Sequence, residues 1–393
     1  MKRFLLLVPL LVMFARPGLA GGTCRCRDAA EHAQRQEQFD RVLRAHDTMG
    51  ASIALISDGQ IVDMFQYGRA NRADNIPVEF DTYFKVASVS KMITAVGVMR
   101  MVEEEGIDPD ADFGDYFEYS IRNPYHPDVP ITLRQIMTHT ATLNDGYHYH
   151  RAMGGNIELL RHVLDGNFTR QNYYNRMPGE WVRYSNFGGG LLGAFIEQVT
   201  GYTVDEYMQM RVFFPLGVYG GYHTPCLPHD AKIARVYNTD STGMTFDAES
   251  MDGEHMDADP DTAYVHTAGS AIVNAEGLAK ILIALAGDGS VDGVRILSEE
   301  SVRAMRERQN NIGSVRIDSG RGLNLNIIEN QLVKGRTLYG HQGKAYGMIC
   351  AAYFDPTDRT GVVLLTNGCN TATVDSVARI ARAVIAQAYA YLP

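Results

Sequence analysis

The residues with the clearest chemical potential are Ser88 and Lys91, which lie three apart in the stretch Ser-Val-Ser-Lys. Residues three apart on a helix share one face, so the Ser88 hydroxyl and the Lys91 amine can meet. A serine hydroxyl is barely ionised at neutral pH, and a desolvated lysine can accept its proton. Free N–H groups at the helix start favour the negative charge of a tetrahedral intermediate. Alone, however, a Ser-x-x-Lys spacing arises by chance about once or twice in such a chain.

The segments around this pair predict the elements that hold it. Apolar residues recur at helical spacing from residue 88 to residue 105, and Gly106 ends the pattern. Residues 51–56 are predicted as a strand that turns at Asp58-Gly59 into a return strand at residues 61–67. Ahead of them, the spacing of Phe39, Val42 and Leu43 indicates one face of a helix within residues 28–46, and residues 82–86 are expected to be extended.

The rest of the chain divides into a helical part and a strand-rich part. Helices are predicted at residues 132–138, 157–164, 188–199 and 204–213, and then at 275–286 and 298–306. Strands follow at residues 322–328, 337–339, 346–354 and 361–366, before a final helix at 374–391. This order predicts an α+β fold in which residues 28–106 and 265–393 form one mixed sheet with flanking helices, and residues 107–264 form an inserted, mostly helical domain.

Four stretches place the serine and lysine in a wider pattern. Residues 75–91 lead up to the pair, and residues 132–140 read Thr-Leu-Arg-Gln-Ile-Met-Thr-His-Thr. Tyr184-Ser185-Asn186 precedes a helix, and His341-Gln342-Gly343 is predicted to open a strand, with Gly347 four residues further on. In order and spacing these stretches resemble the class C β-lactamases and their D-peptidase and esterase relatives. The resemblance runs from Phe39 to the C-terminus and implies a β-lactamase/transpeptidase-like α/β sandwich with a mainly antiparallel sheet.

The resemblance implies a role for each polar residue. Ser88 would be the acylated nucleophile and Lys91 its activating partner, while Tyr184 would share their protons and pass one to the leaving group. Asn186 would hydrogen-bond Lys91 and the substrate amide. The backbone N–H groups of Ser88 and Lys344 would form the oxyanion hole. Whether Lys91 or Tyr184 is the acylation base stays open.

Two positions depart from the family's usual pattern. His341 stands where β-lactamases have a lysine, a permanent cation that suits the carboxylate of a β-lactam. A histidine is only partly charged at neutral pH and can donate, accept or shuttle a proton. Relatives with His-x-Gly here, which keep the glycine equivalent to Gly343, are mostly D-peptidases, D-aminopeptidases and esterases. The second departure, Ala141-Thr142 in place of Ser-Gly, puts the local turn in question.

These features predict a serine hydrolase that forms an acyl-enzyme on Ser88 and acts as a D-peptidase or amidase of the carboxypeptidase or D-aminopeptidase type. One alternative is an esterase for small esters with weak β-lactamase activity. Another, of a different class, is a binding or regulatory module without turnover. The expected partner is a small-molecule or peptide substrate, and no cofactor and no metal are expected. The sequence leaves the oligomeric state open.

The N-terminus predicts export. Lys2 and Arg3 precede an apolar run at residues 4–15, and Gly18-Leu19-Ala20 offers small residues for cleavage. Residues 1–20 are therefore predicted to be a signal peptide, too short for a membrane span, with an uncleaved anchor as the alternative. The mature chain is expected in the periplasm or outside the cell, without an integral membrane segment. The formal net charge is −10, and losing three basic residues with the signal makes it more negative, which argues against nucleic-acid binding.

Other polar clusters point less clearly to function. The five cysteines have no zinc-type spacing, and His148-Tyr149-His150 could bind a metal on an extended segment but lacks an evident third ligand. We interpret it instead as surface or as a wall facing the substrate. The eight acidic residues from Asp240 to Asp261 predict an exposed loop rather than a calcium site. Asn167 begins a glycosylation triplet, and Trp181 is expected in the core.

Overall fold

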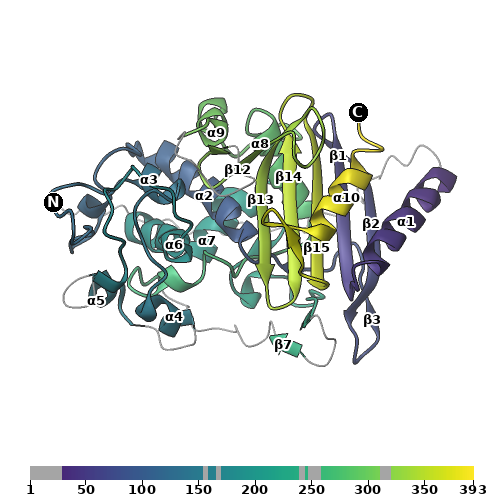
Figure 1. Cartoon of the computed structure of the whole chain (residues 1–393), viewed down its shortest axis with the longest axis horizontal. Helices are drawn as coiled ribbons and strands as arrows, with labels where there is room; N and C mark the ends of the chain where they lie inside the picture. Colours follow the sequence, from purple (N-terminus) through teal and green to yellow (C-terminus); the bar gives the residue numbers. More distant parts are fainter. Residues whose placement is uncertain (1–28, 154–157, 165–169, 239–243, 247–257, 310–319) are drawn as a thin grey trace, which may run out of the picture.

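The computed structural model describes residues 29–153, 158–164, 170–238, 244–246, 258–309 and 320–393 (Figure 1). The predicted signal peptide, Asn167 and most of the acidic segment lie outside these residues. Over the part of the chain that is described, no helix combines the length and apolar character needed to cross a membrane.

The structure is organised around an eight-stranded sheet with the order β11-β12-β13-β14-β15-β1-β2-β3. Every pairing within it is antiparallel. Strand β1 from the N-terminal part pairs with β15 from the C-terminal part, so both ends of the chain build one sheet. The predicted α+β fold is confirmed. The strands are β1 (Gly50–Ser57), β2 (Gln60–Asn71), β3 (Ile76–Pro77), β11 (Gly320–Arg321), β12 (Asn326–Glu329), β13 (Thr337–Ala345), β14 (Met348–Asp355) and β15 (Thr360–Gly368).

Helices bury both faces of this sheet (Figure 1). Helices α1 (Ala29–Arg44) and α10 (Arg379–Ala388) cover one face, and α8 (Ala275–Ala286) packs on the other. Along β15, Val362 and Leu364 belong to the cluster under α1 and α10, while Val363 and Leu365 belong to the cluster that contains α8. Each such side chain stabilises the fold by about 1.5–3 kcal/mol when fully buried. The sheet is therefore a rigid support for the side chains on its strands.

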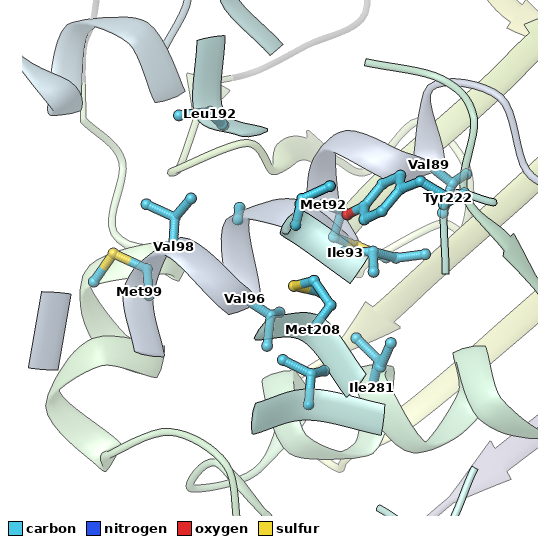
Figure 2. Packing of buried hydrophobic residues seen from close by; sticks show 14 of the residues in the cluster. Val89, Met92, Ile93, Val96, Val98, Met99, Leu192, Met208, Tyr222 and Ile281 are labelled. Atoms are coloured by element: carbon cyan, nitrogen blue, oxygen red, sulfur yellow. The ribbon is translucent and has the colours of Figure 1, made fainter. Parts of the chain in front are cut away.

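Helix α2 (Val89–Glu105) lies between the sheet and the helical part of the molecule. Most of its residues are buried on all sides, and it ends at Gly106, whose φ of 64° is left-handed. Figure 2 shows its apolar side chains in one cluster with Leu192, Met208 and Ile281. A helix that is apolar all round is a core helix. The core therefore holds its first turn, which begins directly after the partly exposed Ser88 and carries the buried Lys91.

Short helices and turns make up most of the middle of the chain. Helix α6 (Asn186–Thr200) packs against α2, and three small strands, β4, β8 and β5, form a separate sheet beside it. Further elements are η1 (Phe113–Tyr116), α3 (Leu133–Met137), α4 (Tyr147–Met153), α5 (Leu160–Leu164), α7 (Val204–Met208), η3 (Gln209–Phe213), η4 (Thr224–Cys226), η6 (Ala263–Val265), α9 (Glu299–Arg306), β4 (Phe84–Lys85), β5 (Gly220–Gly221), β6 (Val236–Tyr237), β7 (Met244–Phe246), β8 (Ile272–Val273), β9 (Ser290–Val291), β10 (Val294–Arg295), β16 (Thr373–Val374) and β17 (Val377–Ala378).

Several predicted boundaries were wrong. The last helix begins at Arg379, because residues 373–378 form the hairpin of β16 and β17 with left-handed φ values of 49° and 71° at Asp375 and Ser376. The strand predicted at residues 337–339 continues to Ala345, so His341 lies inside a strand and does not open one. Residues 244–246, within the predicted acidic loop, form β7 and pair with β6.

Candidate active site

Ser88 follows a strained turn at the start of α2. Ala87 has a φ of 46°, a left-handed conformation that costs a residue with a Cβ about 1–3 kcal/mol. Two bonds hold this turn: the Ser90 hydroxyl donates to the Ala87 carbonyl at 2.6 Å and accepts the Ala271 N–H at 3.0 Å. Ser88 itself stays partly exposed. The turn therefore presents the hydroxyl from a fixed backbone to the outside.

The Lys91 side chain is fully buried, and its Nζ has three hydrogen-bond partners. Its Nζ donates to Ser88 Oγ at 3.3 Å, to Asn186 Oδ1 at 2.8 Å and to the Ala268 carbonyl at 2.6 Å. Gly189 on α6 leaves room for the side chain, since a Cβ there would lie 2.7 Å from Lys91 Cε. The structure thus brings the predicted serine, lysine and asparagine together around one amine.

Tyr184 lies next to this amine in a cationic environment. Lys91 Nζ is 4.9 Å from the centroid of its ring, and Arg321 Cζ is 6.0 Å from it. Two imidazoles flank the same ring, with centroid distances of 4.5 Å for His139 and 6.2 Å for His341. A phenol among cations and bases suits a group that must give up and take back a proton.

His341 is buried and neutral. Its Nδ1 lies 2.7 Å from the Gln342 carbonyl, which can only accept, so Nδ1 carries the proton and Nε2 carries the lone pair. Burial and the neighbouring Lys91 charge lower the pKa of His341 to about 3. The partial charge expected at neutral pH is therefore absent. Nε2 has no hydrogen-bond partner among the described residues.

His139 and Arg321 belong to the site although the sequence analysis assigned them no role. The Ser185 N–H donates to His139 Nδ1 at 3.3 Å, and burial together with the Arg321 and Lys91 charges holds the pKa of His139 well below its usual value. Arg321, on β11, is 6% exposed and donates to Asn326 Oδ1 at 3.1 Å. His139 lies inside the motif at residues 132–140, which is a usable signal. No sequence pattern marks Arg321.

Gly343 and Lys344 lie on β13 beside the nucleophile. A Cβ on Gly343 would stand 2.2 Å from the Val86 carbonyl oxygen and 3.2 Å from the Ser88 nitrogen. Only glycine therefore lets this strand run against the turn. The Lys344 ammonium is directed elsewhere and donates to the Thr371 carbonyl at 2.9 Å. Any contribution of Lys344 to an oxyanion hole would come from its backbone N–H.

The remaining candidates lie apart from this cluster or differ from expectation. His148 and His150 are on helix α4, not on an extended segment, and His148 Nδ1 lies 2.7 Å from Glu158 Oε2. No group of three or more potential metal ligands occurs within the described ranges. Trp181, expected in the core, is only half-buried. The turn at Ala141-Thr142 forms without glycine, because Thr142 itself takes a left-handed φ of 62°.

Comparisons with known proteins show the family and the fold. The Beta-lactamase family model matches residues 34–387. The chain is 26% identical to Penicillin-binding protein 4 of Amycolatopsis lactamdurans over 343 residues, or 86% of each chain. It is 30% identical to Esterase EstB of Burkholderia gladioli over 202 residues, or 49% of this chain and 51% of the esterase. The D-amino acid amidase from Ochrobactrum anthropi SV3, solved with D-phenylalanine, shares the fold with a TM-score of 0.69 at 21% identity, covering 92% of this chain and 99% of that one.

Proposed function

Because the chain belongs to the Beta-lactamase family of serine hydrolases, we propose that it is an exported D-peptidase or amidase whose acyl-enzyme forms on Ser88. The observation that carries this proposal is the buried Lys91 amine, bonded at once to the Ser88 hydroxyl and to Asn186. A lysine enclosed in this way supports proton transfer from a serine. The same contact counts against a binding module without turnover.

The reaction follows from the positions of these groups. The Ser88 oxygen attacks the substrate carbonyl carbon while its proton passes to Lys91 or Tyr184, and the backbone N–H groups of Ser88 and Lys344 receive the oxyanion. The tetrahedral intermediate collapses and the C–N bond breaks as this same proton, passed on through Tyr184, goes to the leaving amine, so that Lys91 and Tyr184 return to their starting states. A water molecule then loses a proton to the same base and attacks the ester. The acid leaves and the proton returns to Ser88 Oγ.

His341 supports an amide or peptide substrate over a β-lactam. Its ring is neutral: Nδ1 donates to the Gln342 carbonyl, and Nε2, on the other side of the ring, offers a lone pair and no positive charge. A carboxylate prefers a cation or an N–H donor, so this position lacks what a β-lactam carboxylate needs. Substrates with a donor group near the cut, such as D-amino acid amides or peptides, suit it better. The likeness to a D-amino acid amidase supports the same substrate class.

Esterase activity is the second candidate, favoured by the relationship to Esterase EstB. An ester needs the same nucleophile and oxyanion hole, and its alkoxide leaving group depends less on protonation by Tyr184 than an amine does.

The proposal of export rests on the composition of residues 1–20. Fractionation of cells that express the full chain, and the chain without residues 1–20, tests it: retention of both forms inside the cell would contradict export.

The enzymatic proposal is tested by comparing the mature chain with Ser88→Ala. Labelling by a fluorophosphonate should appear in the parent and vanish in the variant. Assays with D-alanyl peptides, D-aminoacyl anilides, nitrophenyl esters and a chromogenic cephalosporin then rank the substrates. We expect D-substrates to be cleaved and the cephalosporin to be a poor substrate, with kcat/KM falling by about 10³-fold or more in Ser88→Ala. A parent that takes no label, or a variant that labels equally, would sink the proposal.

A further inference from the structure

The loop before α4 holds a carboxylate that the mechanism above does not use. Asp145 accepts four hydrogen bonds, all from the start of α6. Its Oδ1 accepts the Ser185 hydroxyl at 2.8 Å and the Phe187 N–H at 2.9 Å, and its Oδ2 accepts the backbone N–H of Asn186 at 3.0 Å and its Nδ2 at 2.8 Å. All four donors belong to Ser185, Asn186 and Phe187, the three residues that follow Tyr184. The carboxylate therefore joins a loop to the residues that carry the site.

The bond to Asn186 Nδ2 decides which way this side-chain amide faces. A carboxylate only accepts, so the NH₂ group must point to Asp145, and the amide oxygen is left for Lys91 Nζ at 2.8 Å. The flipped amide would set oxygen against carboxylate and NH₂ against ammonium. Either contact would leave a charged group facing the wrong partner, which is unfavourable for buried groups. The amide of Asn186 thus has one orientation.

The loop backbone holds Asp145 in place. The Asn144 N–H donates to the Asn172 carbonyl and the Gly146 N–H donates to the Asn144 carbonyl, both at 2.8 Å. A Cβ on Gly146 would stand 2.3 Å from the Gln171 carbonyl oxygen, so the loop passes this close only because the residue is glycine. The carboxylate is therefore fixed by contacts that do not depend on α6.

From these contacts we propose that Asp145 is a positioning residue for acylation: it orients the Asn186 amide, which in turn orients Lys91 toward Ser88. The proposal rests on the function proposed above and names a residue outside the family motifs. The bonds form a chain from Asp145 Oδ2 through Asn186 and Lys91 to Ser88 Oγ. None of the hydrogen bonds of Asp145 reaches Ser88, so its effect on the chemistry should pass through the start of α6, and above all through the Asn186 amide that contacts Lys91.

A double-mutant cycle on the full-length mature chain tests this route. The variants are Asp145→Ala, Asn186→Ala and the combination, and the readout is the single-turnover rate of Ser88 labelling by a nitrophenyl ester, with KM and the thermal midpoint measured alongside. We expect Asp145→Ala to slow acylation by about tenfold or more with little change in KM. In the Asn186→Ala background the same substitution should change the rate by less than about twofold. An equal loss in both backgrounds would overturn the proposal, since it would mean that Asp145 acts without Asn186.

Two further variants keep the result interpretable. Asn144→Ala removes a side-chain bond from the same loop, the one to the Gln171 carbonyl, and should keep the acylation rate. Asp145→Asn keeps the shape and one acceptor oxygen, so it should lose less rate than Asp145→Ala, and it serves if Asp145→Ala does not fold. Full parental rate in both Asp145 variants would also refute the idea. A parent that is not labelled at all contradicts the proposed function instead, because the cycle needs an active Ser88.

Discussion

The two sides of the site differ in how completely their polar atoms are satisfied. The helical side is formed by α2, α6 and the loop at Asp145. There the Lys91 amine and the Asn186 amide are hydrogen-bonded to each other, and also to the Ala268 carbonyl and the Asp145 carboxylate. On the strand side, the Nε2 atom of His341 on β13 is buried without a partner in the described structure. Buried polar atoms left unpaired are costly. The helical side therefore fixes the reacting groups, and the strand side keeps capacity for a substrate or a water molecule.

The largest effect is expected from breaking the helical side at its centre. Lys91→Met keeps the length of the buried side chain but removes all three donated bonds. Loss of this amine, whether it accepts the Ser88 proton itself or prepares Tyr184 to do so, should lower kcat/KM about 10³-fold. Steady-state kinetics on the best substrate, with intact-protein mass spectrometry for the acyl-enzyme, measures this. A variant within tenfold of the parent would show that Tyr184 alone serves as the base.

A smaller effect is expected where the strand side touches the nucleophile. Gly343→Ala places a methyl group 2.2 Å from the Val86 oxygen, so β13 or the turn must shift. A displacement of about 1 Å in a catalytic site can cost 10²-fold in rate, and we expect a loss of that order. Gly269→Ala is the matched control near the same turn, because its new methyl would lie no closer than 4.0 Å to Ala87. Equal losses in both variants would argue that β13 does not position Ser88.

The smallest effect concerns stability and tests whether His341 on the strand side is uncharged. Burial lowers the pKa of His341 to about 3, so the folded state excludes a proton that the unfolded chain binds below about pH 6.5. The unfolded state binds more protons, and stability falls as the pH drops. Between pH 7 and pH 5 the parent should lose about 2 kcal/mol more than His341→Gln. Urea titrations at both pH values test this, with exposed His150→Gln, expected to follow the parent, as control.

The sequence predicted those parts of the molecule whose information is local. The helix from Ser88 to Gly106 follows from apolar spacing and a glycine stop, and the continuous burial of β14 and β15 follows from unbroken apolar runs between turns. The order of four short motifs was enough to predict that Ser88, Lys91, Tyr184 and Asn186 belong together. Lys91 does contact Ser88 and Asn186 directly.

The contacts that the sequence could not supply are those between distant loops. Asp145 meets Asn186 across 41 positions, and nothing in the composition of its loop marks it as a ligand of α6. Arg321 reaches Tyr184 only because β11 is added to the far edge of the sheet. The sequence also could not predict the charge state of His341, because that depends on burial beside Lys91 and not on residue type alone.

The pairing of β1 with β15 has a consequence for the order in which the protein is made. Residues 50–57 are synthesised early but find their partner, residues 360–368, only near the end of translation. Strand β13, which lies against the Ser88 turn, also belongs to this late segment. Contacts so distant in sequence form slowly and late. The nucleophile turn would therefore lack its β13 contact on the growing chain, and the complete site would form only after the C-terminal strands have been made.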